Sequence, residues 1–315
     1  MRIGPHLKIH LIGMLHMNKT RIVLLSGFLG SGKTTLLKHL LAQENQQHVA
    51  VVMNEVGEVS IDGKLLSPDT HLSEITDGCI CCTGRDELER AILTLYQQQK
   101  PDVIYIESSG IAHLLEVIDA CLSPVIAEYM TIQKVITIVD SERWSKKHLY
   151  RKPLQKLMDE QIKYADQVLI NKADLITQQQ FETIVQDIKM IQPNAQWRMT
   201  THGRMPLDTH YFTHANGRAT EAHMEHHLHV HHFVYTFKKV ISKRALDAFV
   251  RALPATVFRI KGFVSVDEYP EKTTLFQYSF GVPLYFPQEV KFLTTLVFIG
   301  EDLEIEQLKQ QLEAI

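Results

Sequence analysis

The feature that most constrains the fold of this chain is a glycine-rich segment, GFLGSGKTT, at residues 27–35. It follows the apolar run Arg21–Leu25, which is typical of a buried strand, and it precedes leucines at helical spacing. The segment matches G-x-x-x-x-G-K-[ST], a pattern whose backbone N–H groups cradle phosphate oxygens at the start of a helix. We therefore expect an α/β domain of the P-loop NTPase class, with a mostly parallel sheet.

The positions of this loop predict how a nucleoside triphosphate is held. Lys33 is placed to reach the β- and γ-phosphates, and the Thr34 hydroxyl is placed to bind Mg²⁺. The helix that follows directs its dipole and its free amides at the same anion. We expect Lys33 to be catalytic and the nucleotide to contact Gly27, Gly30, Ser31, Gly32, Lys33, Thr34 and Thr35.

Three further apolar runs are expected to form parallel strands, and each ends in a polar residue: Glu107, Asp140 or Asn171. Ligands of such sheets bind outside the carboxyl ends of the strands, so these side chains should lie beside the phosphate loop. Glu107 is the catalytic candidate, as an outer-sphere Mg²⁺ ligand or as the group that positions water. The Gly110 amide is a candidate contact for the γ-phosphate. An ordinary loop acid is the alternative interpretation of Glu107.

The tetrapeptide Asn171-Lys172-Ala173-Asp174 predicts which base is bound. An aspartate can accept two hydrogen bonds from guanine, one from N1–H and one from the exocyclic amine, and adenine offers no such pair. Leaving a buried carboxylate unpaired is costly, so the motif favours GTP over ATP. We expect Asn171, Lys172 and Asp174 to bind the guanine nucleotide.

A cluster of thiols, Cys79-Ile80-Cys81-Cys82, lies between these two nucleotide motifs. Three thiolates suit Zn²⁺ or Cu(I) far better than Mg²⁺, and turn residues on both sides would let the three converge. Water, a partner protein or a carboxylate such as Glu58 could supply a fourth ligand. Buried or redox-active thiols without metal are the alternative.

Composition and length set the domain organisation. The chain has 315 residues, 45% of them hydrophobic, and a net charge of −3, which argues against a nucleic-acid or membrane-directed role. We expect a non-native or disordered extension over 1–20 and a P-loop GTPase domain over 21–201. A histidine-rich linker over 202–232 and an α+β domain over 233–315 should follow. Without a cleavable signal or a long apolar span, we expect a cytoplasmic protein.

Nine of the 17 histidines fall within residues 202–232. Near pH 7 most of these imidazoles would be neutral and could bind Zn²⁺, Ni²⁺ or Co²⁺. A solvated linker that binds no metal in the cell is the alternative. The candidates for secondary metal sites are His223, His226, His227, His229 and His231.

The C-terminal region is expected to form an antiparallel sheet that two helices cover on one face. One helix begins near Ser242, and Asp302 is expected to cap the last one. The region shows no catalytic constellation, so we expect it to contact a client protein or a second copy. The expected strands lie at 233–237 and near 257–266, 274–280 and 293–299.

Together these segments resemble the CobW-like subfamily of metal-trafficking P-loop GTPases, relatives of the urease- and hydrogenase-maturation GTPases. The likeness is close over residues 21–175 and looser beyond, where FRIKGF at 258–263 is similar to the second domain of that family. The chain departs from the family at Met53, where a carboxylate is usual. The matching elements, in the order of the family, are GFLGSGKTTLL, NEVGEVSID, GCICC, ESSGIA and NKADL.

The resemblance implies slow GTP hydrolysis that is coupled to transfer of a metal, most often zinc, into a client metalloprotein. By that analogy Cys79, Cys81 and Cys82 bind the metal, and GTP with Mg²⁺ alters their geometry. Slow turnover also fits the lack of an obvious catalytic glutamine or arginine finger. We expect no nucleic-acid or membrane partner, and a homodimer that forms with nucleotide or metal stays open.

Three alternatives remain at this point. The chain could be a metal store or sensor that GTP regulates, or it could deliver cobalt or nickel for the maturation of a cofactor or metalloenzyme. A small-molecule kinase could use the same phosphate loop, but the guanine motif argues against it.

Overall fold

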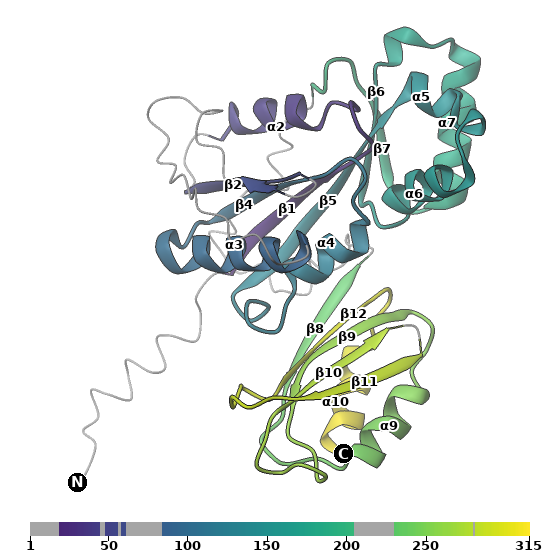
Figure 1. Ribbon diagram of the computed structural model, residues 1–315. Helices are drawn as coiled ribbons and strands as arrows, with labels where there is room; N and C mark the ends of the chain where they lie inside the picture. Colours follow the sequence, from purple (N-terminus) through teal and green to yellow (C-terminus); the bar gives the residue numbers. More distant parts are fainter. Residues whose placement is uncertain (1–18, 45–47, 56–57, 61–83, 205–229, 280) are drawn as a thin grey trace.

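The computed structural model describes residues 19–44, 48–55, 58–60, 84–204, 230–279 and 281–315. These residues form two sheets with their covering helices, one in each half of the chain (Figure 1). No helix in the described part of the chain combines the length and the apolar character that a bilayer span requires.

The first sheet has seven strands in the order β3-β2-β4-β1-β5-β6-β7, all parallel except β3, which runs antiparallel to β2. This confirms the expected α/β class. Its strands are β1 (Thr20–Ser26), β2 (Val49–Glu55), β3 (Glu58–Ser60), β4 (Val103–Ser108), β5 (Met130–Asp140), β6 (Gln167–Asn171) and β7 (Gln196–Met199). Its helices are α2 (Lys33–Leu41), α3 (Gly84–Gln99), α4 (Leu114–Cys121), α5 (Ser141–Ser145), α6 (Lys152–Lys163) and α7 (Gln178–Ile191), with the short 3-10 helices η3 (Lys147–Leu149) and η4 (Ala173–Leu175).

Strand β1 is buried on both faces, as a central strand of a parallel sheet must be. Ile22 and Leu24 pack with residues of α3 and α4, whereas Val23 and Leu25 pack with residues of α2. The alternation of side chains along the strand therefore attaches helices to both faces of the sheet (Figure 1). With β1 fixed in this way, the loop that follows it emerges at the carboxyl edge of the sheet.

The second sheet has five antiparallel strands in the order β11-β10-β9-β12-β8. Helices α9 and α10 cover one face, where Leu246 and Leu312 are fully buried against Phe276 and Phe298. The expected sheet with two helices on one face is thus confirmed. Its strands are β8 (His231–Thr236), β9 (Val257–Val264), β10 (Thr274–Ser279), β11 (Val282–Pro287) and β12 (Thr295–Gly300), and its helices are α9 (Lys243–Arg251) and α10 (Ile305–Glu313).

The structure corrects three details of the C-terminal prediction. Asp302 does not cap the last helix, because it lies in a turn with φ of 48° and α10 begins only at Ile305. Strand β11 was not expected, since its two prolines argue against a strand, yet an edge strand tolerates them. Strand β8 begins at His231, so the last two histidines of the expected linker belong to the second sheet.

Candidate phosphate and guanine site

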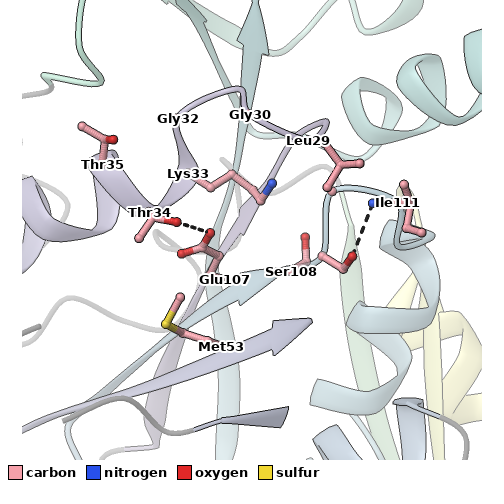
Figure 2. Close-up of a pocket in the computed structure, with 12 residues that line it drawn as sticks. Leu29, Gly30, Gly32, Lys33, Thr34, Thr35, Met53, Glu107, Ser108 and Ile111 are labelled. Carbon is pink, nitrogen blue, oxygen red and sulfur yellow. Dashed lines mark hydrogen bonds between the residues drawn. The ribbon is translucent and has the colours of Figure 1, made fainter. Parts of the chain in front are cut away.

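A cavity of about 550 Å³ opens at the carboxyl ends of β1 and β4, where the phosphate loop meets the segment after β4 (Figure 2). Its size is in the range of small-molecule sites. The cavity lies on the side of the sheet that was predicted for the ligand. It is lined by Leu29, Gly30, Gly32, Lys33, Thr34, Thr35, Met53, Glu107, Ser108, Ser109, Gly110 and Ile111.

The phosphate loop is already folded around this cavity. The Ser31 N–H donates to the Phe28 carbonyl at 3.1 Å, and the Asn171 side chain donates to the Ser31 carbonyl at 2.8 Å. Gly32 has φ of 108°, and a Cβ added there would lie 2.5 Å from Asn171 Nδ2. A side chain at this φ would be strained, so the path of the loop beside Asn171 requires glycine at position 32.

Lys33 points from the start of α2 back along the loop (Figure 2). Its side chain is 7% exposed, and Nζ donates to the carbonyls of Gly27 at 2.9 Å and Phe28 at 3.4 Å. An ammonium held over the cradle in this way can exchange carbonyl acceptors for phosphate oxygens, which form stronger charge-assisted hydrogen bonds. The geometry therefore agrees with the role that the motif predicts for Lys33.

Thr34 and Glu107 meet at the floor of the cavity. The Thr34 hydroxyl donates to Glu107 Oε1 at 2.7 Å, and Glu107 is only 8% exposed. Glu107 comes from β4, whose register pairs it with Leu25 directly before the loop. A hydroxyl and a carboxylate at this spacing offer the hard oxygen donors that Mg²⁺ prefers, so these residues fit the expected ion.

The segment after β4 packs directly on the phosphate loop. A Cβ added at Gly110 would lie 2.5 Å from the Leu29 nitrogen, so a side chain at this position would force the two segments apart. Gln161 of α6 donates to the Gly110 carbonyl at 3.1 Å, and the Ser108 hydroxyl donates to the Leu25 carbonyl at 3.1 Å. These contacts fix the backbone near the expected position of the γ-phosphate.

The guanine motif lies beside the same loop, at the end of β6. Lys172 has φ of 59°, and its Nζ donates to Asp140 Oδ2 at 2.6 Å. The Ser141 hydroxyl donates to the Lys172 carbonyl at 2.8 Å. Asp174 is exposed in η4, so the cost of leaving its carboxylate unpaired arises only when a base covers it.

Two supporting residues, Gly203 and Arg143, were not found from the sequence, and a third, Asp140, was expected beside the loop without its partner. The Gly203 N–H donates to Asn171 Oδ1 at 3.0 Å, so both ends of that amide are held. Asp140 was noted as a polar residue at a strand end, but its ion pair with Lys172 was not foreseen. Arg143 lies against the outer side of the loop, 5.8 Å from the centre of the Phe28 ring. Neither Gly203 nor Arg143 belongs to a local pattern that signals this role.

Most of the residues predicted to bind a transition metal lie outside the described part of the chain. This holds for Cys79, Cys81 and Cys82, for the Glu58 side chain, and for His223, His226, His227 and His229. The remaining candidate, His231, is the first residue of β8. The pKa of its neighbour His232 is lowered to about 4, mainly by burial and then by Lys19 and His231. Among the described residues, no three His, Cys, Asp or Glu side chains gather to hold an ion.

Comparison with protein families matches both halves of the chain. The nucleotide-binding domain described as CobW/HypB/UreG matches residues 21–198, and the cobalamin synthesis protein cobW C-terminal domain matches residues 230–315. The first match covers nearly all of the seven-stranded sheet and the second covers the five-stranded sheet, and residues 199–229 lie between them.

Curated relatives cover the chain to different extents. Zinc chaperone YjiA from Escherichia coli is 30% identical over 93% of this chain and 98% of its own length. Zinc-regulated GTPase metalloprotein activator 1 from Dictyostelium discoideum is also 30% identical, over 63% of this chain, which spans 49% of that relative. Among solved structures, Zn(II)-bound YjiA GTPase from E. coli is 26% identical with a TM-score of 0.49, over 95% of this chain and 99% of that chain.

Proposed function

This chain belongs to the CobW/HypB/UreG family of nucleotide-binding proteins, and on that premise we propose that it hydrolyses GTP and transfers Zn²⁺ to a client protein. The observation that supports GTP hydrolysis is the Thr34–Glu107 hydrogen bond of 2.7 Å beneath the phosphate loop. The names of the relatives, zinc chaperone and zinc-regulated GTPase metalloprotein activator, support the transfer of Zn²⁺ to a client protein.

Different residues in and beside the cavity would bind the phosphates, the Mg²⁺ ion and the guanine base. The loop amides and Lys33 hold the β- and γ-phosphates, and Asn171 fixes the loop through the Ser31 carbonyl. Thr34 and Glu107 would hold Mg²⁺, which neutralises charge on the β- and γ-phosphate oxygens. Asp174 would accept the two guanine N–H groups.

The chemical step needs an oriented water. Its oxygen attacks the γ-phosphorus, the bond from that phosphorus to the β,γ-bridging oxygen breaks, and GDP and phosphate leave. Glu107 and Gly110 both line the cavity, so Glu107 would orient this water with the metal bound and the Gly110 N–H would contact the γ-phosphate. Arg143 is the nearby cation on the outer side of the loop, where its Nε is 3.6 Å from Asp140.

The transition metal is proposed to bind Cys79, Cys81 and Cys82, with Glu58 as a further donor. Their place in the sequence supports this assignment. Strand β3, which carries Glu58, precedes the thiols in the sequence, and helix α3 begins at Gly84, two residues after Cys82. The thiols are thus joined along the chain to two elements of the nucleotide domain, through which nucleotide state would alter the metal ligands.

Two measurements on purified protein test this proposal. We expect magnesium-dependent hydrolysis of GTP, with ATP turned over far more slowly, and one tightly bound Zn²⁺ that is lost when Cys79, Cys81 and Cys82 are replaced by serine. Cys121→Ala is the matched control, because this thiol is fully buried in α4 and burial raises its pKa. Equal use of ATP would contradict the nucleotide assignment. Zinc retention by the triple variant would contradict the metal assignment and favour a histidine-based store.

A further inference from the structure

Strand β9 of the second sheet carries two basic residues that reach the first domain. Arg259 Nε lies 2.7 Å from Asp119 Oδ1 of α4, and Lys261 Nζ donates to Glu89 Oε2 of α3 at 3.4 Å. The two cations are separated by one residue of a strand, so they project from the same face of the sheet. That face is the one opposite α9 and α10.

The ion pairs lie within an apolar interface between the two domains. Phe258, Val297 and Ile299 of the second sheet share one core with residues of α3 and α4. Asp119 is 1% exposed, so its carboxylate would be costly to bury without Arg259. A guanidinium is planar and directional, which makes this pair sensitive to the position of α4.

The two helices held by β9 are the ones that adjoin the proposed functional segments. Helix α4 begins four residues after Gly110, so the segment that lines the γ-phosphate end of the cavity leads into it. Helix α3 begins at Gly84, two residues after Cys82. Strand β9 therefore contacts both helices: α4, which follows the segment that lines the cavity, and α3, which follows the thiol segment.

We propose that Arg259 and Lys261 are positioning residues that couple the nucleotide cavity and the thiol segment to the C-terminal domain. The proposal rests on the function proposed above. A change at the γ-phosphate that moves Gly110 would shift α4 and hence Asp119, and β9 would follow through Arg259. Lys261 would carry the same displacement to α3 through Glu89. Linkage requires the reverse effect on binding, so contacts on the C-terminal sheet would alter the relative affinities of the nucleotide site for GTP and GDP.

Kinetics of the full chain test the positioning role. For Arg259→Gln we expect kcat for GTP to fall by roughly fivefold or more, because a misplacement of about 1 Å caused by a distant substitution can lower a rate by up to about a hundredfold. The KM for GTP should stay within about twofold, since the phosphate loop and the guanine motif lie on other elements. Arg259→Lys should recover part of the loss. Lys243→Gln is the control, because Lys243 makes an exposed ion pair with Glu268 in the same domain.

Hydrogen exchange on the wild-type chain tests the coupling even if a variant fails to fold. Replacing GDP with a non-hydrolysable GTP analogue should change the protection of β9 amides, and the Glu89→Gln/Lys261→Gln variant should show a smaller change. Unchanged β9 exchange, or a folded Arg259→Gln protein with wild-type kcat, would overturn the coupling. If the wild-type chain does not turn over GTP but its β9 exchange still depends on the nucleotide, the proposed hydrolysis is contradicted and the coupling is supported.

Discussion

Thr34 and Glu107 are 73 positions apart in the chain, yet the threonine hydroxyl donates to the glutamate carboxylate at 2.7 Å. The contact joins the first turn of α2 to the end of β4. Helix α2 follows β1 in the chain, and β1 and β4 are neighbours in the sheet. The contact places a hydroxyl and a carboxylate side by side beneath the phosphate loop. The proposed Mg²⁺ site is therefore largely preorganised, which is how a P-loop site avoids reorganisation during the reaction.

Replacing Glu107 with glutamine should lower kcat for GTP by about 10²-fold, a typical loss for a group that organises the attacking water. An amide keeps the shape and the hydrogen bond to Thr34 but removes the negative charge. Steady-state turnover and binding of a fluorescent GDP analogue would separate catalysis from affinity. Glu116→Gln, on the exposed side of α4, is the control. Wild-type turnover in the Glu107 variant would show that this carboxylate is an ordinary strand-end acid.

Replacing Asp174 with asparagine should weaken GTP binding by about 1–3 kcal/mol, because one of two hydrogen bonds to guanine becomes a clash of donors. The same variant should gain affinity for xanthosine triphosphate, whose carbonyl at the position of the guanine amine can accept from the new carboxamide. Competition between the two triphosphates measures both effects. If Asp174→Asn keeps the wild-type preference for GTP, the base lies elsewhere.

Gly110→Ala should lower GTP turnover while leaving the two sheets folded. The added Cβ would lie 2.5 Å from the backbone nitrogen of Leu29, and backbone cannot move aside as a flexible side chain can. Forced contacts of this kind cost about 1–3 kcal/mol. Turnover and thermal melting should be measured together. A variant with unchanged kcat would mean that the contact between the two segments does not shape the cavity.

The lowered pKa of the partly buried His232 predicts a loss of stability in acid. Its folded pKa of about 4 lies below the ordinary value of 6.5, so the unfolded chain binds the proton first. Stability is therefore complete above pH 6.5 and falls as the pH drops towards 4, by no more than about 3 kcal/mol. Urea unfolding of wild type and His232→Gln across this range should show a steeper decline for wild type. His148→Gln, at an exposed histidine, should follow the wild-type curve.

Local patterns were sufficient to predict the central strands of the nucleotide domain, whereas β3 and β7 were not expected. The phosphate loop, the polar ends of β4 and β6, and the buried runs before them are determined by neighbouring residues, and the structure brings Lys33, Thr34 and Glu107 together as expected.

Features that depend on distant contacts were missed. Strand β11 contains Pro283 and Pro287, and only its edge position in the sheet makes them acceptable. The Arg259–Asp119 pair joins residues from different domains, and Gly203 reaches Asn171 through its backbone, where the side-chain pattern carries no signal. The start of α10 was misplaced because Asp302 resembles a helix cap but adopts a left-handed turn.

The most direct test of the proposed function is zinc affinity as a function of nucleotide state. Competition with a chromogenic chelator would be run with GDP and with a non-hydrolysable GTP analogue, on a chain with serine at His223, His226, His227 and His229, with and without serine at the three clustered thiols. We predict tight, thiol-dependent binding whose affinity differs between the two nucleotides by about fivefold or more. Affinity that ignores the nucleotide, or that survives loss of all three thiols, would contradict a GTP-driven metal transfer.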